Sequence, residues 1–382
     1  MDLRLTPTQI ALREEAKAFA EELRPSLAAD PEWRRQGLLS DGDSRDVTSA
    51  LGGAGWIGMT WPEEHGGRGL AHVDAALVED VFGYYWLPLS LYLLSYKTIG
   101  CALERFAAPP LKERLLGSIA RGELTFCQGF SEPSAGSDLA SLTTRGVRHD
   151  DRFVVDGHKI WTSSAWLADW IYLAVRTGSA ESRHRGISVL VAPIDSPGID
   201  VRRFPVLGGG YLCEVFLDGV EVPAENLVGE VDRGWDVLMH TLDFERITAE
   251  KLGGLAWLLD ALEQRLAETE RFDAAWPRFA SLRGELAAAR LLSLRAADLL
   301  DRGEPASAAS AMAKLAGARL AQRLASEAID LLGLDGLADG HASAPLEGRI
   351  GGLYRASVGS TISGGSSEIL QVVIARRGLG LR

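Results

Sequence analysis

Cysteine and positive charge are both scarce in this chain of 382 residues. The only cysteines are Cys101, Cys127 and Cys213, and no CxxC pair occurs. A sparse, odd number of cysteines favours buried thiols in a reducing compartment over a disulfide framework. Lys and Arg number 40 against 52 Asp and Glu, which gives a net charge of −12. This balance argues against nucleic acid or an anionic membrane as the main partner.

Membrane, metal and common nucleotide signals are also missing. The longest apolar run, WLPLSLYLLSY (residues 86–96), is too short to span a bilayer, so we expect a buried helix or pocket wall. No secretory pattern opens the chain, which predicts a cytoplasmic protein. The seven histidines show no metal-ligand spacing, and we expect no metal site. Gly53, Gly55 and Gly58 satisfy GxGxxG, but no strand precedes them and no helix follows, which disfavours a dinucleotide site.

The residue pattern along the chain changes twice. Residues 1–122 have helical apolar spacing, with a helix-start signal at Thr6-Pro7. Residues 123–230 contain short β-rich runs at 125–127, 152–157, 169–175, 186–193 and 213–222. Gly, Pro, Asp and Ser separate these runs, which is typical of an antiparallel sheet or small barrel. Residues 231–382 return to long Ala- and Leu-rich helical segments, including 233–270, 277–302, 307–332 and about 367–377. The sequence therefore predicts an α+β protein with a helical N-terminal domain, a central antiparallel β-domain and a C-terminal helical bundle.

Two segments in the β-rich region have a composition suited to ligand binding. QGFSEPSAGSD (128–138) is rich in small and hydroxyl residues, and KIWTSS (159–164) places one Trp beside further hydroxyls. Gly136 permits close backbone approach, while Ser131 and Ser137 can donate to phosphates. A solvated turn is the alternative interpretation, because the same residue types favour turns for generic reasons.

A carboxylate lies on an apolar stripe near the start of the last region. If the segment is one helix, Glu245 shares a face with Leu238, Leu242, Ala249 and Leu252. A buried, unpaired carboxylate is costly, and enzymes use such groups as bases near neutral pH. The alternatives are a buried pair with Arg246 or Lys251, or an interface contact.

Together these features resemble the acyl-CoA dehydrogenase family over essentially the whole chain. In order, the matching segments are LGGAGWIGMTWPEEHGGRG, QGFSEPSAGSD, GHKIWTSSA, EVFLDGVEVPAENLVGE and ISGGSSEILQVVIARRGLGL. The resemblance implies a FAD flavoprotein with a C-terminal four-helix bundle, usually tetrameric. Its reaction would be α,β-dehydrogenation of an acyl thioester, in fatty acid or steroid side-chain metabolism. Electrons would pass to an electron-transfer flavoprotein, and the thioester would be carried either by CoA or by a carrier protein.

The resemblance also assigns roles residue by residue. Phe130 and Ser131 would contact the isoalloxazine ring, Trp161 would cover it, and Ser163 would bond near N5. Ser137 would meet the FAD pyrophosphate. The backbone N–H of Gly364 would help to polarise the thioester carbonyl. The remaining residues of the matching signatures that we assign to the site are Gly136, Ser366 and Glu368 for the cofactor and Arg246 for the substrate.

The resemblance gives two places for the base. Many members carry a Glu where this chain has Gly364, and glycine cannot act as a base. Others place it before an Arg on the earlier helix, which Glu245-Arg246 matches. The family pattern and the apolar stripe thus select the same residue.

The segments that normally complete a neighbouring subunit's FAD site depart from the family pattern. Arg271-Phe272-Asp273 stands for R-x-F-G out of register, an expected Gln falls near Ala280, and Asp330 replaces a second Gln. An acid facing FAD phosphates would be repulsive. We therefore expect a tetramer, with a homotetramer and an α2β2 assembly with a paralogous subunit as the two alternatives. Two rival interpretations are a flavin monooxygenase or oxidase on the same scaffold, and a non-catalytic partner subunit.

Overall fold

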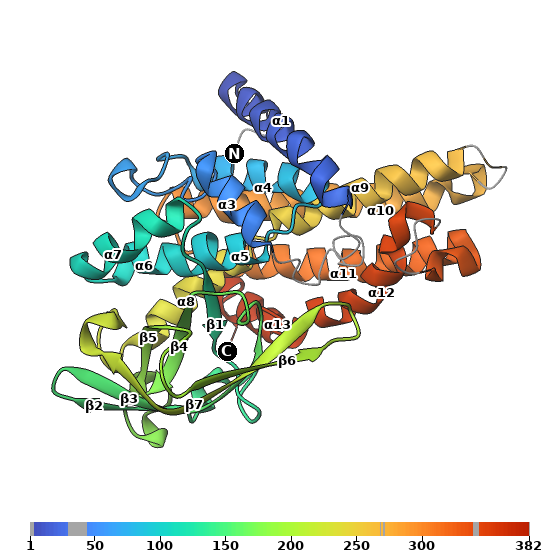
Figure 1. The fold of residues 1–382 in the computed structure, drawn as a ribbon. Coiled ribbons are helices and arrows are strands. Elements are labelled where there is room, and N and C mark those ends of the chain that lie inside the picture. The colour runs from blue at the N-terminus through green and yellow to red at the C-terminus, as the bar shows by residue number, and fades with distance from the viewer. Residues whose placement is uncertain (1–3, 30–43, 268, 270–271, 339–343, 382) are drawn as a thin grey trace.

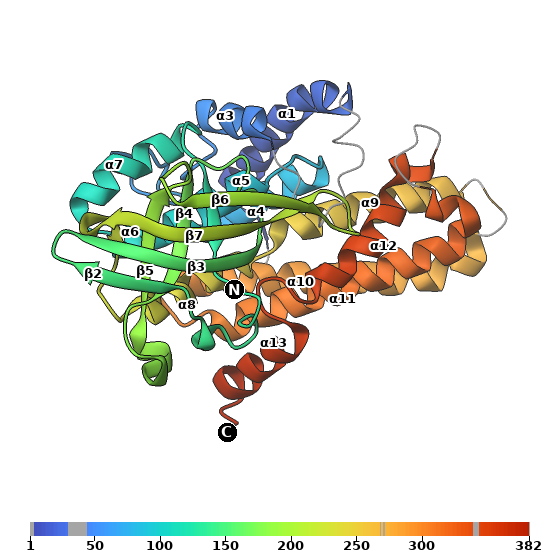
Figure 2. The ribbon, with the colours of Figure 1, turned by 60° about the horizontal axis from the view of Figure 1, so that its bottom comes forward.

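The computed structural model describes residues 4–29, 44–267, 269, 272–338 and 344–381. Helices from both ends of the chain pack against one another on one side of the molecule, and the strands form the other side (Figures 1 and 2). The predicted class and order, helices then strands then helices, are confirmed.

The N-terminal region is helical. Its elements are α1 (Pro7–Ala29), α3 (Arg45–Gly53), η1 (Glu63–His65), α4 (His72–Tyr84), α5 (Ser90–Tyr92), the π-helix η2 (Leu93–Gly100), α6 (Cys101–Phe106) and α7 (Pro109–Ala120). The predicted start at Thr6 is confirmed, because Thr6 and Gln9 form a reciprocal cap. The Gln9 backbone N–H donates to Thr6 Oγ1 at 3.2 Å, and the Thr6 N–H donates to Gln9 Oε1 at 3.0 Å.

The middle region is one mixed sheet. Its strands are β1 (Phe126–Gly129), β2 (Arg145–His149), β3 (Arg152–Thr162), β4 (Trp170–Arg176), β5 (Ile187–Pro193), β6 (Ile199–Pro205), β7 (Tyr211–Pro223) and β8 (Leu227–Val228), with 3-10 turns η3 (Leu139–Ser141), η4 (Ala180–Gly186) and η5 (Ala224–Asn226) between them. The order is β6-β7-β3-β2-β4-β5-β8, and β1 pairs with β4. Most pairings are antiparallel as expected, but β4 runs parallel to β1 and β2. The sequence did not reveal β2 and β6, because these strands are largely exposed and polar.

The C-terminal region contains the helices of the bundle. Its elements are α8 (Gly234–Glu245), α9 (Ala249–Ala267), α10 (Phe272–Asp301), α11 (Ser307–Leu332), η6 (Gly333–Leu337), η7 (Pro345–Gly348), α12 (Arg349–Ser360), α13 (Ser367–Val373) and η8 (Ile374–Gly378). The expectation of one helix over 233–270 is wrong: the chain breaks at 246–248, between α8 and α9. No Gly or Pro marks this break, and Thr248, a residue type favoured just before a helix, is a weak local sign of it.

The break matters because α8 lies where the layers of the fold meet. Helix α8 packs against β5, η2 and α11, while α13 packs against α11. Its buried residues Leu238 and Phe244 belong to the same apolar core as Phe130 and Tyr172 of the sheet region. The last residue of α8 is therefore held at the boundary between the sheet and the helices.

Candidate functional site

The two signature segments of the sheet are tied together by buried contacts. The backbone N–H of Ile160 donates to the Ser131 carbonyl at 3.0 Å. The fully buried Lys159 donates through Nζ to the Phe130 carbonyl at 3.1 Å and to Glu132 Oε1 at 2.8 Å. The segments 128–138 and 159–164 thus form one continuous cradle.

Glu132 organises the next turn of this cradle. Its carboxylate accepts from the backbone N–H of Thr143 at 2.7 Å and from that of Thr144 at 2.8 Å. Burial opposes ionisation, but Lys159 and the threonine donors outweigh it and lower the pKa of Glu132 to about 2. Glu132 and Lys159 were not predicted from the sequence as residues of the site. Their presence inside the two signature segments was a signal, because a Lys and a Glu that become buried need each other as partners.

The cradle leaves room for a flat, polar ligand. Trp161 is 57% exposed and has a backbone φ of +61°, which an L side chain rarely adopts. The buried atoms Thr162 Oγ1 and Gln128 Oε1 have no hydrogen-bond partner among the described residues. A Cβ added at Gly136 would touch nothing within 4 Å. An exposed indole, orphaned polar atoms and an open backbone fit a ring-bearing cofactor with phosphates.

Contacts between aromatic and hydroxyl side chains connect the cradle to α8. The rings of Phe130 and Tyr172 lie 5.7 Å apart between centroids. The hydroxyl of Tyr172, on β4, is 3.1 Å from Thr241 Oγ1, one helical turn before Glu245. The ligand-facing loop and the candidate base therefore share one rigid support.

Glu245 closes α8 beside the glycine turn at 364–365. Its Oε1 lies 3.2 Å from the position that a Cβ on Gly364 would occupy. Its Oε2 is buried and has no hydrogen-bond partner among the described residues. Leu238 and Leu242 share its helix as expected, but Ala249 and Leu252 lie beyond the break, on α9. A buried carboxylate oxygen without a donor is available to take a proton.

Two cations hold the glycine turn. Arg246 Nε donates to the Gly364 carbonyl at 3.0 Å, and Lys314 Nζ donates to the Gly365 carbonyl at 2.8 Å. Gly364 and Gly365 have φ values of +64° and +106°, which favour glycine at both positions. Arg246 thus has a positioning role, and its direct contact with substrate stays a prediction.

Other predicted residues have simpler surroundings. Ser366 caps α13, accepting from the Ile369 N–H at 3.3 Å, and Glu368 lies exposed in its first turn. Ser137 is exposed, while Ser163 is half-buried after Trp161. His158 stacks on Phe216 at 4.2 Å between ring centroids.

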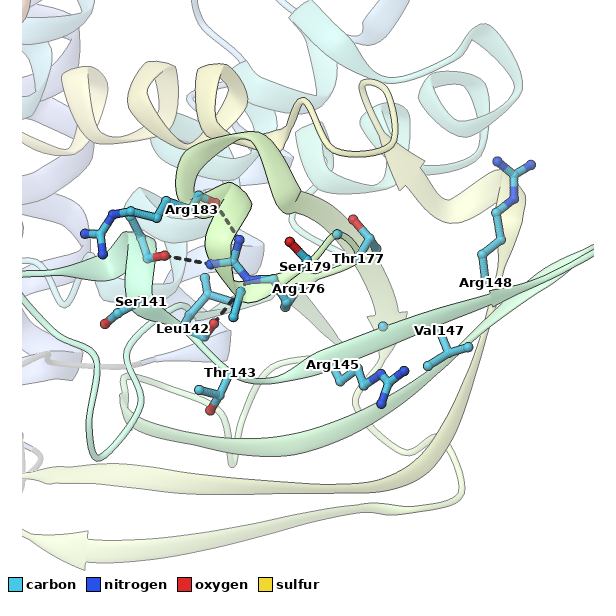
Figure 3. Close-up of a pocket in the computed structure, with 14 residues that line it drawn as sticks. Ser141, Leu142, Thr143, Arg145, Val147, Arg148, Arg176, Thr177, Ser179 and Arg183 are labelled. Atoms are coloured by element: carbon cyan, nitrogen blue, oxygen red, sulfur yellow. Dashed lines mark hydrogen bonds between the residues drawn. The ribbon is translucent and has the colours of Figure 1, made fainter.

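A groove of about 630 Å³ lies beside the first signature, lined by residues of 140–148 and 176–183. Arg176 donates from inside this groove to the carbonyls of Ala140 at 2.6 Å and Leu142 at 3.4 Å, and also to that of Arg183. Figure 3 shows the side chains of Arg145 and Arg148 lying apart from Arg176, so the arginines do not converge on one point. Arg176 therefore stabilises the loop that follows the first signature, and the groove is the space beside it.

The described ranges show no sign of a metal site or of a membrane-spanning helix. No group of three His, Cys, Asp or Glu side chains there could hold a metal ion. No helix within the same ranges has the length and apolar character needed to cross a bilayer.

Comparison with protein-family models matches three consecutive parts of the chain. They are the acyl-CoA dehydrogenase N-terminal domain over residues 6–123, the middle domain over 127–220 and the C-terminal domain over 232–379. Together the matches cover both signature segments, Glu245 and the glycine turn.

Individual relatives match over almost their full length. Acyl-CoA dehydrogenase FadE26 of Mycobacterium tuberculosis is 30% identical, covering 100% of this chain and 99% of the relative. The solved structure titled "Tcur3481-Tcur3483 steroid ACAD" is 32% identical, with a TM-score of 0.91 and complete coverage of both chains. The ChsE4-ChsE5 complex of Mycobacterium tuberculosis is 29% identical, with a TM-score of 0.86 and complete coverage of both chains.

Proposed function

The chain belongs to the acyl-CoA dehydrogenase family, and we propose that Glu245 is the base that removes the α-proton of its substrate. The protein is a FAD-dependent enzyme that converts an acyl-CoA to the 2-enoyl thioester. The observation that carries the assignment of the base is the buried, unpartnered Oε2 of Glu245 next to Gly364.

Glu245 and the glycine turn divide the work on the thioester. Glu245 takes the α-proton, and the electron pair left on the α-carbon forms the double bond as the β-hydrogen departs with its own pair. FAD, when bound, accepts that hydride. The Gly364 N–H belongs to the turn held by Arg246 and Lys314, and it donates to the thioester carbonyl as negative charge develops there.

The exposed Trp161, the open backbone at Gly136 and the orphaned atoms Thr162 Oγ1 and Gln128 Oε1 support a FAD site in the cradle. The proposed ring contacts are Phe130, Ser131, Trp161 and Ser163, and Gly136 and Ser137 would face the pyrophosphate. Ser366 and Glu368, at the start of α13 next to the glycine turn, would contact the cofactor from the C-terminal helices. Ser366 already caps α13, so its contact with FAD would use the oxygen's second lone pair.

The side of the chain that would face a neighbour's FAD is acidic. The side chain of Asp330 is 70% exposed, and its Oδ2 lies 3.1 Å from Arg278 Nη2. Arg278 also donates to Glu327, so the positive charge of Arg278 is already neutralised by Glu327. Ala280, exposed on α10, offers no donor. We infer that the working enzyme is an α2β2 tetramer. The paralogous subunit next to the Ala280 and Asp330 face of this chain would carry no FAD at that contact.

Similar solved structures suggest the substrate class to test first. One similar solved structure is titled a steroid acyl-CoA dehydrogenase, and another is a two-protein complex. We therefore propose a CoA thioester of a bulky, ring-bearing side chain, with an electron-transfer flavoprotein as the acceptor.

Replacement of the base tests the mechanism. Glu245→Gln should lower kcat by roughly 10²–10⁴-fold, because a glutamine cannot take the α-proton. The exchange of the substrate α-hydrogen in deuterated water, followed by mass spectrometry, should fall in parallel. Flavin absorbance should stay unchanged.

The matched control is Glu304→Gln, which alters an exposed Glu in the α10–α11 loop. This control should behave like the wild type. Turnover and exchange that survive in Glu245→Gln would overturn the assignment of the base.

A further inference from the structure

A buried ion cluster lies next to the break between α8 and α9. Lys97, on the π-helix η2, is 6% exposed. Its Nζ lies 2.5 Å from Glu79 Oε2 on α4 and 3.3 Å from Glu250 Oε2 on α9. One buried ammonium therefore joins three helices from two regions of the chain.

Lys97 has another partner, which is not a carboxylate. Its Nζ also donates to the backbone carbonyl of Ile247. Ile247 lies in the short linker of residues 246–248, between the end of α8 and the start of α9. Carbonyls at a helix end lack intrahelical donors, so an outside donor decides where such a linker rests.

The same linker is held from the opposite direction. Arg246 Nε donates to the carbonyl of Gly364, in the turn before α13. Consecutive linker residues are thus anchored to the N-terminal helices through Lys97 and to the C-terminal turn through Arg246. Glu245 immediately precedes both anchors.

We propose that Lys97 is a positioning residue for the reaction: by holding the Ile247 carbonyl, it sets the place of Glu245 relative to the substrate α-carbon. The inference rests on the proposed role of Glu245. Catalysis is sensitive to such placement, since a shift of about 1 Å can cost on the order of 100-fold in rate. The pairing with Glu79 and Glu250 compensates the burial of the ammonium, because a buried charge needs paired partners.

The alternative is that the cluster serves only the stability of the fold. A neutral variant separates the two roles: Lys97→Met with Glu79→Gln and Glu250→Gln removes every charge and also the donor to Ile247. Its matched control is Glu79→Gln with Glu250→Gln, which keeps the Lys97 amine. Both are assayed as FAD-loaded enzyme, with circular dichroism, Tm and flavin content as measures of folding.

We expect the neutral variant to fold and to lose roughly ten-fold or more in kcat, with KM within about three-fold of the wild type. The control should keep kcat within about three-fold, because Lys97, which burial without carboxylates favours as a neutral amine, still donates to the Ile247 carbonyl. A neutral variant with nearly wild-type kcat would overturn the inference.

A second variant keeps the test decisive if the neutral one does not fold. Replacing Thr248 by its α-hydroxy analogue turns the Ile247–Thr248 peptide into an ester, which weakens the Ile247 carbonyl as an acceptor and leaves every side chain in place. A several-fold loss of kcat with an unchanged flavin spectrum supports the inference, and unchanged kcat refutes it.

Glu245→Gln, measured alongside, distinguishes the two proposals. Lost turnover there with full turnover in the neutral variant rejects only the role of Lys97. Full turnover in Glu245→Gln rejects the base itself.

Discussion

At the scale of single residues, Lys314 shows how burial changes the chemistry around the proposed base. Its ammonium is buried and donates to the Gly365 carbonyl at 2.8 Å. Burial, followed by the nearby Lys251, lowers the pKa of Lys314 to about 8, and Glu245 opposes the shift. The proton of this side chain is therefore released within the pH range in which enzymes are commonly assayed.

This shift predicts a change of stability with pH. The unfolded Lys keeps its proton up to about 10.5 and the folded one only to about 8, so the unfolded chain binds more protons between these values. Stability attributable to Lys314 should then rise with pH across that window. Comparing Tm at several pH values for the wild type and Lys314→Met checks this. The difference, wild type minus variant, should grow from pH 8 upward, and a constant difference would contradict the prediction.

At the scale of elements, the turn between α12 and α13 illustrates why glycine stands at residue 364. The turn needs positive φ at Gly364, and the space where a Cβ would project is already bounded by Glu245 Oε1 at 3.2 Å. A side chain there would compete with Glu245 for the same volume. The proposed base on α8 and the glycine in the turn are therefore two parts of one arrangement.

Gly364→Ala tests this arrangement. The added methyl group would strain the backbone by about 1–2 kcal/mol and push the Glu245 carboxylate aside. We expect a folded protein whose kcat is lower by roughly ten-fold or more, as misplacement of a catalytic group implies. Steady-state kinetics and Tm measure the two effects.

Gly359→Ala is the matched control, because an added Cβ there meets nothing within 4 Å and the residue lies in helix α12. It should raise stability by about 0.5–1 kcal/mol and leave kcat unchanged. Equal kcat in both variants would show that the volume beside Glu245 is not critical.

At the scale of the whole molecule, the charges on α10 and α11 bear on assembly. Asp330 stands where the family pattern has a glutamine, and its only described cationic contact, Arg278, is shared with Glu327. A carboxylate directed at another subunit's FAD phosphates repels them. A homotetramer would place four such faces against four cofactors.

The prediction is that this chain expressed alone contains less than one FAD per chain. Co-expression with a related acyl-CoA dehydrogenase subunit from the same organism should give a tetramer of two kinds of chain with a stable flavin content. Size-exclusion chromatography with light scattering and flavin absorbance measure both properties. Asp330→Gln, expressed alone, should bind more FAD than the wild type. A stable homotetramer with one FAD per chain would contradict the α2β2 proposal.

Local pattern determined much of this protein. Helical spacing, short β-rich runs and turn residues are properties of neighbouring residues, and they predicted the order of the regions and most of the strands. The signature segments 128–138 and 159–164 and the Glu245-Arg246 pair could likewise be recognised from the sequence. The exposed strands β2 and β6 escaped, because few apolar residues mark them.

Only the tertiary structure decided how these parts meet. The α8–α9 break has no Gly or Pro signal, and Lys97, which donates to the Ile247 carbonyl in this break, lies 150 residues away from it. Arg246 and Gly364 are 118 residues apart, and Lys314 and Gly365 are 51 apart. Periodicity along the chain cannot encode contacts over such separations, because they depend on how whole helices pack. The sequence by itself therefore identified the proposed base, and the fold determined what holds it in place.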